Sequence, residues 1–273
     1  MNLSLSGKVA LVTGGSRGIG AATVRMFVAA GAQVLFNYEK SKQQADQLVK
    51  ELSGPSIANR NVASNVATAG NCAAVACNLS GTETARELVA SAVNRFGRLD
   101  ILIANHGVWP AKDQPIDQMS DSQWHSTVAI NLDSVFALIK HSVAQMKKQQ
   151  KSGNAAGHIV LVSSTAGQRG EAFHCDYAAT KGALISMVKG LSTELAGDGI
   201  YVNCVAPGWV DTDMSASALN DPKSRAAIFA TIALGRVAKP EEIAAPILFL
   251  CTPHAGFITG EVFNVNGGAV LAG

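Results

Sequence analysis

The fold of this chain is decided by a glycine-rich stretch near its start, Thr13-Gly14-Gly15-Ser16-Arg17-Gly18-Ile19-Gly20. The apolar run 9–12 precedes it, and apolar residues recur at helical spacing through residues 21–30 after it. The glycines therefore connect a predicted buried strand to a predicted helix. At such a junction, free N–H groups and the helix dipole can bind a nucleotide pyrophosphate. A glycine-rich turn without a ligand is the alternative, and the flanking strand and helix favour the binding site.

Three glycines have distinct predicted tasks in this stretch. Gly14 permits a tight turn, Gly18 lets the backbone approach the phosphates, and Gly20 lets the helix pack closely on the strand. The other residues of the stretch that we expect to contact the cofactor are Ser16, Arg17 and Ile19.

Strand and helix patterns alternate along the sequence, which predicts an α/β fold with a doubly wound parallel sheet and helices on both faces. Predicted strands cover residues 9–12, 33–38, 72–77, 99–104, 158–163, 200–206 and 260–265. Predicted helices cover residues 21–30, 43–52, 82–96, 177–195, a long segment from a cap at Asp121 or Ser122 to Gln150, and a segment that begins near Pro240. No linker separates two halves, so we expect one domain over residues 1–273, with residues 54–71 as an extended surface loop.

The composition argues against several classes of function. Apolar residues make up 48% of the chain and aromatic residues only 5%, which suits strands buried on both faces. The net charge is +2 and no basic run is longer than Lys147-Lys148, so we expect no nucleic-acid partner. No apolar stretch approaches the ~20 residues that span a bilayer, and residues 1–8 carry no secretory signal, so we expect no membrane partner. The five cysteines are scattered without a C-x-x-C pair, which predicts reduced thiols, a cytoplasmic protein and no metal site.

The candidate chemistry lies in a tyrosine and a lysine four residues apart on one predicted helix face, Tyr177 and Lys181. An ammonium near a phenol lowers the tyrosine pKa, so Tyr177 could exchange a proton with an alcohol or carbonyl oxygen near neutral pH. A second pair with this spacing, Tyr38 and Lys42, we interpret as accidental. Only Tyr177 follows a serine, Ser164, at the carboxyl end of a predicted buried strand, where ligands bind in open parallel sheets.

Together, T-G-x-x-x-G-x-G and the spacing of Ser164, Tyr177 and Lys181 resemble the short-chain dehydrogenase/reductase family. The resemblance implies a Rossmann-like sheet of about seven strands in the order 3-2-1-4-5-6-7. It implies that Ser164 holds the substrate oxygen, Tyr177 is the acid/base and Lys181 also binds the nicotinamide ribose. Asn131 resembles the family residue that supports the lysine through water, although a polar residue in an apolar helix needs a partner in any case.

Two positions beside this set have competing interpretations. Ser163 is an alternative to Ser164, but neighbours on a strand face opposite sides, and the spacing favours Ser164. In Asn105-His106-Gly107, which stands where the family has Asn-Ala-Gly, the histidine is a departure. His106 is either a packed or solvated side chain or a residue that lines the pocket.

The resemblance extends to further cofactor contacts over nearly the whole chain. The residues that it implies are Asn105 and Gly107 beside the cofactor, Asn78 and Leu79 at the adenine, and Pro207, Gly208, Val210 and Thr212 near the nicotinamide. Residues 207–235 correspond to the substrate loop region. The C-terminal third resembles the part that often builds a tetramer interface, so we expect a homotetramer.

The resemblance implies reversible, nicotinamide-dependent interconversion of a carbonyl and an alcohol. Within the family, the sequence is most similar to the 3-oxoacyl-acyl-carrier-protein reductases and the sugar dehydrogenases near them. An NAD-dependent dehydrogenase of a small alcohol, sugar or steroid stays open, as does a non-enzymatic dinucleotide-binding protein.

The choice between NADP and NAD depends on the end of the second predicted strand. An acid that would hold the ribose 2′-hydroxyl of NAD is expected there, but the position is Tyr38. Arg17 in the glycine stretch, with Lys40-Ser41-Lys42, matches a 2′-phosphate, whereas Glu39 would repel it. These residues favour NADP, with NAD as the alternative.

Overall fold

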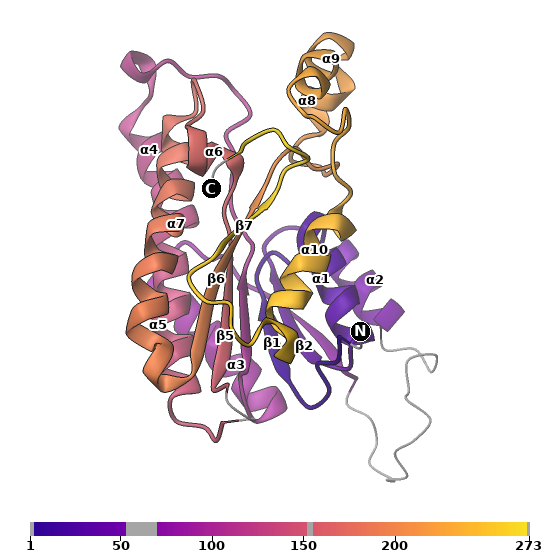
Figure 1. The fold of residues 1–273 in the computed structure, drawn as a ribbon, viewed down its shortest axis with the longest axis vertical. Coiled ribbons are helices and arrows are strands. Elements are labelled where there is room, and N and C mark those ends of the chain that lie inside the picture. Colours follow the sequence, from indigo (N-terminus) through magenta and orange to yellow (C-terminus); the bar gives the residue numbers. More distant parts are fainter. Residues whose placement is uncertain (1–2, 53–69, 152–154, 272–273) are drawn as a thin grey trace.

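A seven-stranded, all-parallel sheet organises the computed structural model of the protein, which describes residues 3–52, 70–151 and 155–271. The strand order is β3-β2-β1-β4-β5-β6-β7, which confirms the predicted doubly wound, Rossmann-like arrangement (Figure 1). The strands are β1 (Val9–Val12), β2 (Gln33–Tyr38), β3 (Cys72–Ala76), β4 (Ile101–Ala104), β5 (Gly157–Val162), β6 (Ile200–Pro207) and β7 (Val262–Val265). Most predicted strand bounds differ from these by one or two residues.

Alternate residues of the strands feed two separate hydrophobic layers. On β1, Ala10 and Val12 pack with the layer of α1 (Gly18–Ala29), α2 (Lys42–Leu52) and α10 (Pro240–Leu250). Leu11 between them packs with the layer of α3 (Thr82–Phe96), α5 (Ser134–Met146) and α7 (Cys175–Leu195). Both faces are covered because side chains alternate along a strand and both sets are apolar. Figure 1 shows the two helix layers on opposite sides of the sheet.

The single long helix predicted from Asp121 or Ser122 to Gln150 is wrong in three respects. Its cap is Ser120, whose hydroxyl accepts a hydrogen bond from the Gln123 N–H at 3.2 Å. A π turn, Ala129–Asp133, separates α4 (Asp121–Val128) from α5, and α5 ends at Met146. The π turn places Asn131 where it can bind another segment, a tertiary requirement that helical periodicity does not encode.

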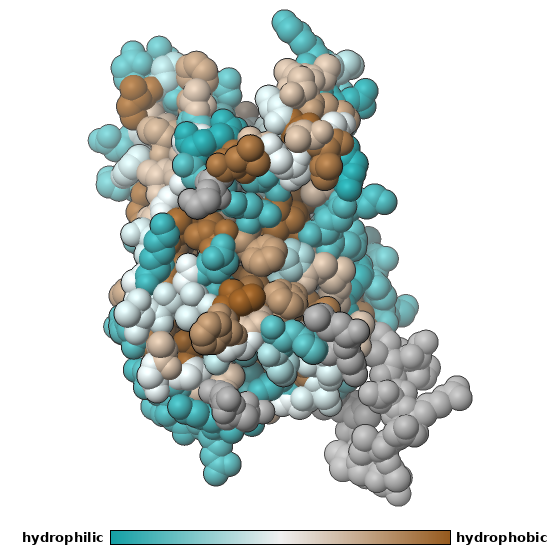
Figure 2. Space-filling model, viewed as in Figure 1, coloured by the Kyte–Doolittle hydropathy of each residue, from teal (hydrophilic) through white to brown (hydrophobic). Residues whose placement is uncertain are grey.

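Two projections stand above the edge of the sheet where the strands end. One contains residues 105–120 with α4, and the other contains α8 (Ala216–Asn220) and α9 (Pro222–Ala230) from the predicted substrate loop region (Figure 1). The space-filling view is hollowed between them (Figure 2). The remaining short elements are α6 (Thr165–Arg169) and 3₁₀ turns at Ile116–Gln118, Ala196–Asp198 and Pro253–Ala255.

The extended loop predicted at residues 54–71 lies outside the described residues except for its last two positions. In the part of the chain that the structure describes, no helix has the length and apolar character needed to cross a membrane.

Candidate active site

A cavity of about 470 Å³ opens at the carboxyl edge of the sheet, between the two projections. Most of the predicted site residues line it: Gly14, Ser16, Arg17, Gly18, Ile19, Tyr38, Asn78, Leu79, Asn105, Gly107, Ser164, Tyr177, Lys181, Pro207, Gly208, Val210 and Thr212. Gly20 and Asn131 do not line the cavity and lie behind its wall. Residues far apart in the sequence meet here because the strands are parallel and all end at this edge.

The glycine stretch forms an open cradle at the start of α1. Gly14 and Gly18 have φ values of +63° and +53°, which side chains rarely adopt. No side chain caps the helix and its first turn carries no acidic residue, so its N–H groups remain available toward the cavity. A Cβ at Gly20 would lie 2.1 Å from the Gly14 carbonyl oxygen, which confirms the close packing predicted for Gly20. This cradle fits a pyrophosphate.

Asn37 is a residue of the site that our sequence analysis missed. Its Oδ1 accepts a hydrogen bond from the Gly14 N–H at 2.9 Å, and its Nδ2 donates to the Cys77 carbonyl at 3.1 Å. The side chain therefore ties the glycine stretch to the end of β3. The signal was a polar residue inside an otherwise apolar strand, Gln33–Tyr38, which needs a partner when buried.

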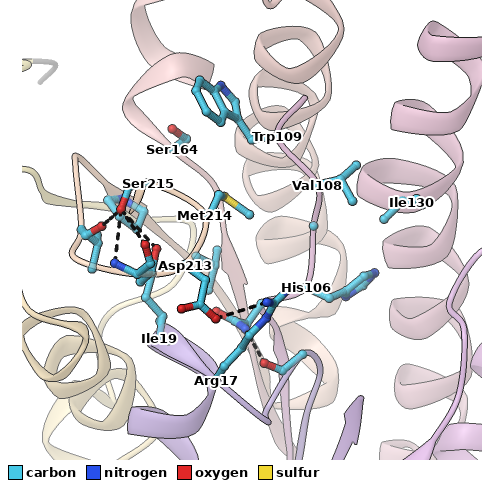
Figure 3. A pocket seen from close by; sticks show the side chains of 18 of the residues that line it. Arg17, Ile19, His106, Val108, Trp109, Ile130, Ser164, Asp213, Met214 and Ser215 are labelled. Atoms are coloured by element: carbon cyan, nitrogen blue, oxygen red, sulfur yellow. Dashed lines mark hydrogen bonds and ion pairs between the residues drawn. The ribbon is translucent and has the colours of Figure 1, made fainter. Parts of the chain in front are cut away.

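Charged side chains at the end of the cavity next to β2 are paired with neighbouring polar or charged groups. The Glu39 carboxylate accepts a hydrogen bond from Asn78 Nδ2 at 3.1 Å, and Lys40 Nζ lies 3.9 Å from it. Arg17 reaches across the cavity to Asp213 at 3.2 Å, with both side chains mostly exposed (Figure 3). Asn78 lines the cavity and holds Glu39 at its wall, and its expected place at the adenine ring stays a prediction.

Tyr177 and Lys181 lie on one face of α7, as their spacing predicted, and both are buried. Lys181 Nζ lies 5.7 Å from the centre of the Tyr177 ring and donates a hydrogen bond to the Val162 carbonyl at 2.8 Å. Burial raises the pKa of Tyr177 to about 12, although a hydrogen bond with Ser164 acts in the opposite direction. Burial lowers the pKa of Lys181 to about 8.

The lowered pKa that we predicted for Tyr177 is therefore wrong for this structure. The desolvation of the phenolate outweighs the hydrogen bond with Ser164, because the tyrosine is buried. Near neutral pH, Tyr177 keeps its proton and Lys181 is charged. This combination suits a proton donor to a carbonyl oxygen.

The two candidate serines have different environments. The Ser163 hydroxyl donates to the Lys181 carbonyl at 2.7 Å, so it is committed to holding α7 against β5. Ser164 caps α6, and its oxygen accepts a hydrogen bond from the Ala166 N–H at 3.1 Å. The Ser164 hydroxyl hydrogen is not used by that cap, which favours Ser164 as the residue that binds a substrate oxygen.

Asn131 is fully buried in the π turn and binds the backbone of one residue. Its Oδ1 accepts from the Val108 N–H at 2.8 Å, and its Nδ2 donates to the Val108 carbonyl at 2.9 Å. Gly107 lies between Asn131 and Lys181, since a Cβ on it would be 3.1 Å from Asn131 Oδ1 and 3.4 Å from Lys181 Nζ. The asparagine therefore holds the segment next to the lysine, and its support of Lys181 through water stays a prediction.

His106 is a packed histidine that also forms part of the cavity wall. Its ring nitrogens lie 2.7 Å from the hydroxyls of Thr13 and Ser134. Burial, together with the charge of Lys181, lowers the pKa of His106 to about 4, so the ring is neutral. Ser134 donates to the Ile130 carbonyl at 2.6 Å, which assigns the ring hydrogen to Nε2. His106 thus links the end of β1 to the start of α5.

The substrate end of the cavity is formed by residues that no sequence signal identified. Trp109 and Glu171 line it with Met214, and all three come from loops, where neither spacing nor periodicity predicts position. Across the described ranges, no group of three or more histidine, cysteine or acidic side chains could hold a metal ion.

Comparison with known proteins assigns the chain to a family. A family model described as "Enoyl-(Acyl carrier protein) reductase" matches residues 55–270. The 3-oxoacyl-[acyl-carrier-protein] reductase of Synechocystis sp. is 36% identical over 269 residues, which cover 98% of this chain and 99% of that protein.

Solved structures agree with this assignment. A 3-ketoacyl-(acyl-carrier-protein) reductase from Brucella melitensis complexed with NADH is 28% identical, with a TM-score of 0.84 and coverage of 98% of this chain and 100% of that one. A putative NAD(P) dependent gluconate 5-dehydrogenase from Beutenbergia cavernae with bound NADP is 30% identical, with a TM-score of 0.83 and coverage of 98% and 99%. These full-length similarities, joined to the cavity with Ser164, Tyr177 and Lys181, place this enzyme among the oxidoreductases: the chain belongs to the short-chain dehydrogenase/reductase family.

Proposed function

We propose that this protein is an NADP(H)-dependent carbonyl reductase that acts on 3-oxoacyl thioesters. The observation that carries the proposal is a buried Tyr177 with Ser164 in one cavity and with Lys181 Nζ 5.7 Å from its ring, at the same edge as the uncapped N-terminus of α1. Tyr177 can supply a proton to a carbonyl oxygen, and the helix N-terminus fits the pyrophosphate of a dinucleotide.

In the proposed reaction, the Ser164 hydroxyl donates a hydrogen bond to the carbonyl oxygen of the substrate. The carbonyl carbon would accept a hydride, which a nicotinamide dinucleotide would supply when bound. Tyr177 transfers its phenolic proton to the oxygen, which becomes the alcohol. The positive charge of Lys181 stabilises the phenolate that is left behind, and its ammonium can also bind the ribose.

Support for a thioester substrate comes from the curated relatives, which carry the name 3-oxoacyl-[acyl-carrier-protein] reductase. The second candidate is oxidation of a small alcohol, sugar or steroid, as the name of the gluconate dehydrogenase suggests. A screen would compare NADPH oxidation with 3-oxoacyl thioesters, aldehydes, keto sugars and ketones, and NAD reduction with the corresponding alcohols. The proposal expects the highest kcat/KM for a 3-oxoacyl thioester. Cofactor binding without turnover on any compound would favour a non-enzymatic dinucleotide-binding protein.

Our choice of NADP rests on Arg17 with Lys40 and Ser41, which line the cavity beside the end of β2. Glu39 opposes it, but its carboxylate is already held by Asn78 and lies near Lys40. The exposed pair of Arg17 and Asp213 is weak, so Arg17 can exchange Asp213 for a phosphate.

The test of this choice is the Arg17→Ala variant. We expect kcat/KM for NADPH to fall by roughly tenfold, the effect of losing one charge-assisted hydrogen bond, while kcat/KM for NADH changes little. An equal loss with both cofactors, or a wild-type preference for NADH, would contradict NADP as the natural cofactor.

We also propose a cytoplasmic location. All five cysteines are free thiols, and three of them are buried, which suits a reducing compartment.

A further inference from the structure

The substrate end of the cavity contains a carboxyl group for which the proposed chemistry has no use. Glu171 lies in the loop between α6 and α7, six residues before Tyr177, and lines the same cavity as Ser164 and Tyr177. Its charge acts on Tyr177, whose pKa it helps to raise after the larger effect of burial. Because Glu171, Ser164 and Tyr177 line one cavity, a substrate bound in it can contact the carboxyl group.

A rigid aromatic cluster holds the position of Glu171. Trp109 Nε1 donates to Glu171 Oε1 at 3.3 Å. The Trp109 ring stacks on His174, with ring centres 4.7 Å apart, and meets the edge of Trp209 at 6.2 Å. His174 is itself buried and bonded to the Pro110 carbonyl at 2.8 Å. Figure 3 shows the side chains of Trp109 and Ser164, which line the same cavity.

The carboxyl group retains unused capacity to accept hydrogen bonds. Among the described residues, the Trp109 indole is the only donor of a hydrogen bond to it, and that bond is long. Burial raises the pKa of Glu171, although His174, the hydrogen bond from Trp109 and the charge of Arg169 act in the opposite direction. An ionised carboxylate can accept about four hydrogen bonds, so a partly buried one with a single indole partner favours a ligand that donates another.

We propose that Glu171 is the hydrogen-bond acceptor of the substrate subsite, and that it selects carbonyl compounds carrying an N–H or O–H donor near the reacting carbonyl. This inference rests on the proposed carbonyl reduction. The donor can be the amide N–H of a thioester arm or a hydroxyl of a hydroxyketone. The faces of Trp109 and Trp209 provide the apolar surface on which the carbon chain of either compound can lie.

Two pairs of substrates, each matched except for the donor, test the proposal. The N-acetylcysteamine thioester of acetoacetate has an amide N–H that its N-methylated analogue lacks, and hydroxyacetone has an O–H that methoxyacetone lacks. The readout is the ratio of kcat/KM within each pair. We expect the wild-type protein to favour the donor-bearing member by roughly tenfold in at least one pair, the effect of one hydrogen bond to a charged group. The pair that shows the preference identifies the source of the donor.

Variants assign that preference to Glu171. Glu171→Ala brings the ratio close to one, whereas Glu171→Gln keeps an acceptor and retains part of the preference. Trp109→Phe removes the indole donor but leaves the carboxyl group, so the preference persists. Glu87→Ala, an exposed change on α3, is the matched control and keeps the wild-type ratio.

Several results would overturn the inference. The first is a wild-type ratio near one in both pairs, and the second is a wild-type ratio that Glu171→Ala leaves unchanged. The third is a preference that Trp109→Phe abolishes as fully as Glu171→Ala does, which would mean that Glu171 only positions the indole. In these cases the protein still reduces ketones and the proposed function stands. A wild-type protein that reduces none of the four compounds overturns the inference together with the proposed function.

Discussion

Tyr177 and Lys181 show how burial sets the chemistry of single residues in this protein. Burial disfavours the charged form of both side chains, so the pKa of Tyr177 rises to about 12 and the pKa of Lys181 falls to about 8. Carbonyl reduction uses the proton of Tyr177 and the charge of Lys181. Of these two groups, Lys181 is the one that titrates first as the pH rises above neutrality.

We therefore predict that kcat/KM for carbonyl reduction falls above about pH 8, as Lys181 loses its proton. The sign follows from the direction of ionisation, because the lysine is charged below its pKa and neutral above it. Lys181→Arg keeps a positive charge and moves the fall to higher pH, at some cost in rate from the different geometry. The measurement is the pH profile from neutral pH upward at saturating cofactor. Lys42→Arg, in the second tyrosine–lysine pair, serves as the control, and a Lys181→Arg profile identical to that of the wild type would contradict the assignment.

Sequence spacing predicted the positions of the reactive residues but not their ionisation. Ser164 and Tyr177 could be placed because a strand end and a helix face follow from local pattern. The pKa of Tyr177 could not be predicted, since it depends on desolvation by segments distant in the sequence. Trp109 and Glu171 could not be placed at all, because both lie in loops whose course no periodicity encodes.

At the scale of elements, the π turn between α4 and α5 is the feature with the clearest functional consequence. It directs the buried Asn131 at both the N–H and the carbonyl of Val108. That contact fixes the chain beside Gly107, which lies against Lys181. Insertions of this kind interrupt a helix only where a tertiary contact compensates, so the sequence predicted one continuous helix.

Asn131→Ala removes both hydrogen bonds to Val108 and a third, from Nδ2 to the Thr180 hydroxyl at 3.3 Å, and it leaves two backbone groups of Val108 without their partner. We expect the free energy of unfolding to fall by about 1–3 kcal/mol and kcat to fall with it. Asn131→Asp, which keeps the acceptor for the Val108 N–H, should lose less stability. Denaturant unfolding and steady-state kinetics measure the two effects, with Ser126→Ala on the exposed face of α4 as the control. Unfolding and kcat values that match the control would show that the π turn has no such role.

At the scale of the whole molecule, apolar side chains remain exposed on the helix layer of α5 and α7. Phe136 on α5 is 52% exposed and Trp124 on α4 is 38% exposed, while α7 presents Ala179 and Gly190 outward. Large exposed aromatic groups and exposed small residues on one helix layer suit a helix-to-helix contact between subunits. We propose that the protein is a homotetramer that uses this face.

Phe136→Glu places a charge in the proposed interface and should reduce the assembly to smaller species, because an unpaired charge is costly to bury. Light scattering at micromolar concentration measures the mass of both proteins. Lys50→Glu, at an exposed position of α2 in the opposite helix layer, is the control for a change of charge alone. A wild-type protein that is a stable monomer would contradict the proposal.

The alternation of strands and helices predicted a parallel sheet, and the family resemblance implied its strand order. The shape of the projections above the sheet could not, since α8, α9 and residues 105–120 are specified by contacts rather than by a repeating pattern. The helical content of residues 207–235 was therefore absent from the prediction, although the cofactor motif from Pro207 to Thr212 was present in it.

Central to this account is Tyr177 as the group that gives its proton to a carbonyl oxygen. The most direct test is the rate of NADPH oxidation with the best carbonyl substrate, measured for the wild type, Tyr177→Phe and the control Tyr38→Phe. We predict that Tyr177→Phe loses roughly 10²–10⁴-fold in kcat while still binding the cofactor, and that Tyr38→Phe leaves the chemical step unchanged. A Tyr177→Phe variant whose kcat stays within roughly threefold of the wild type would contradict the account, because general acid catalysis by Tyr177 would then be excluded.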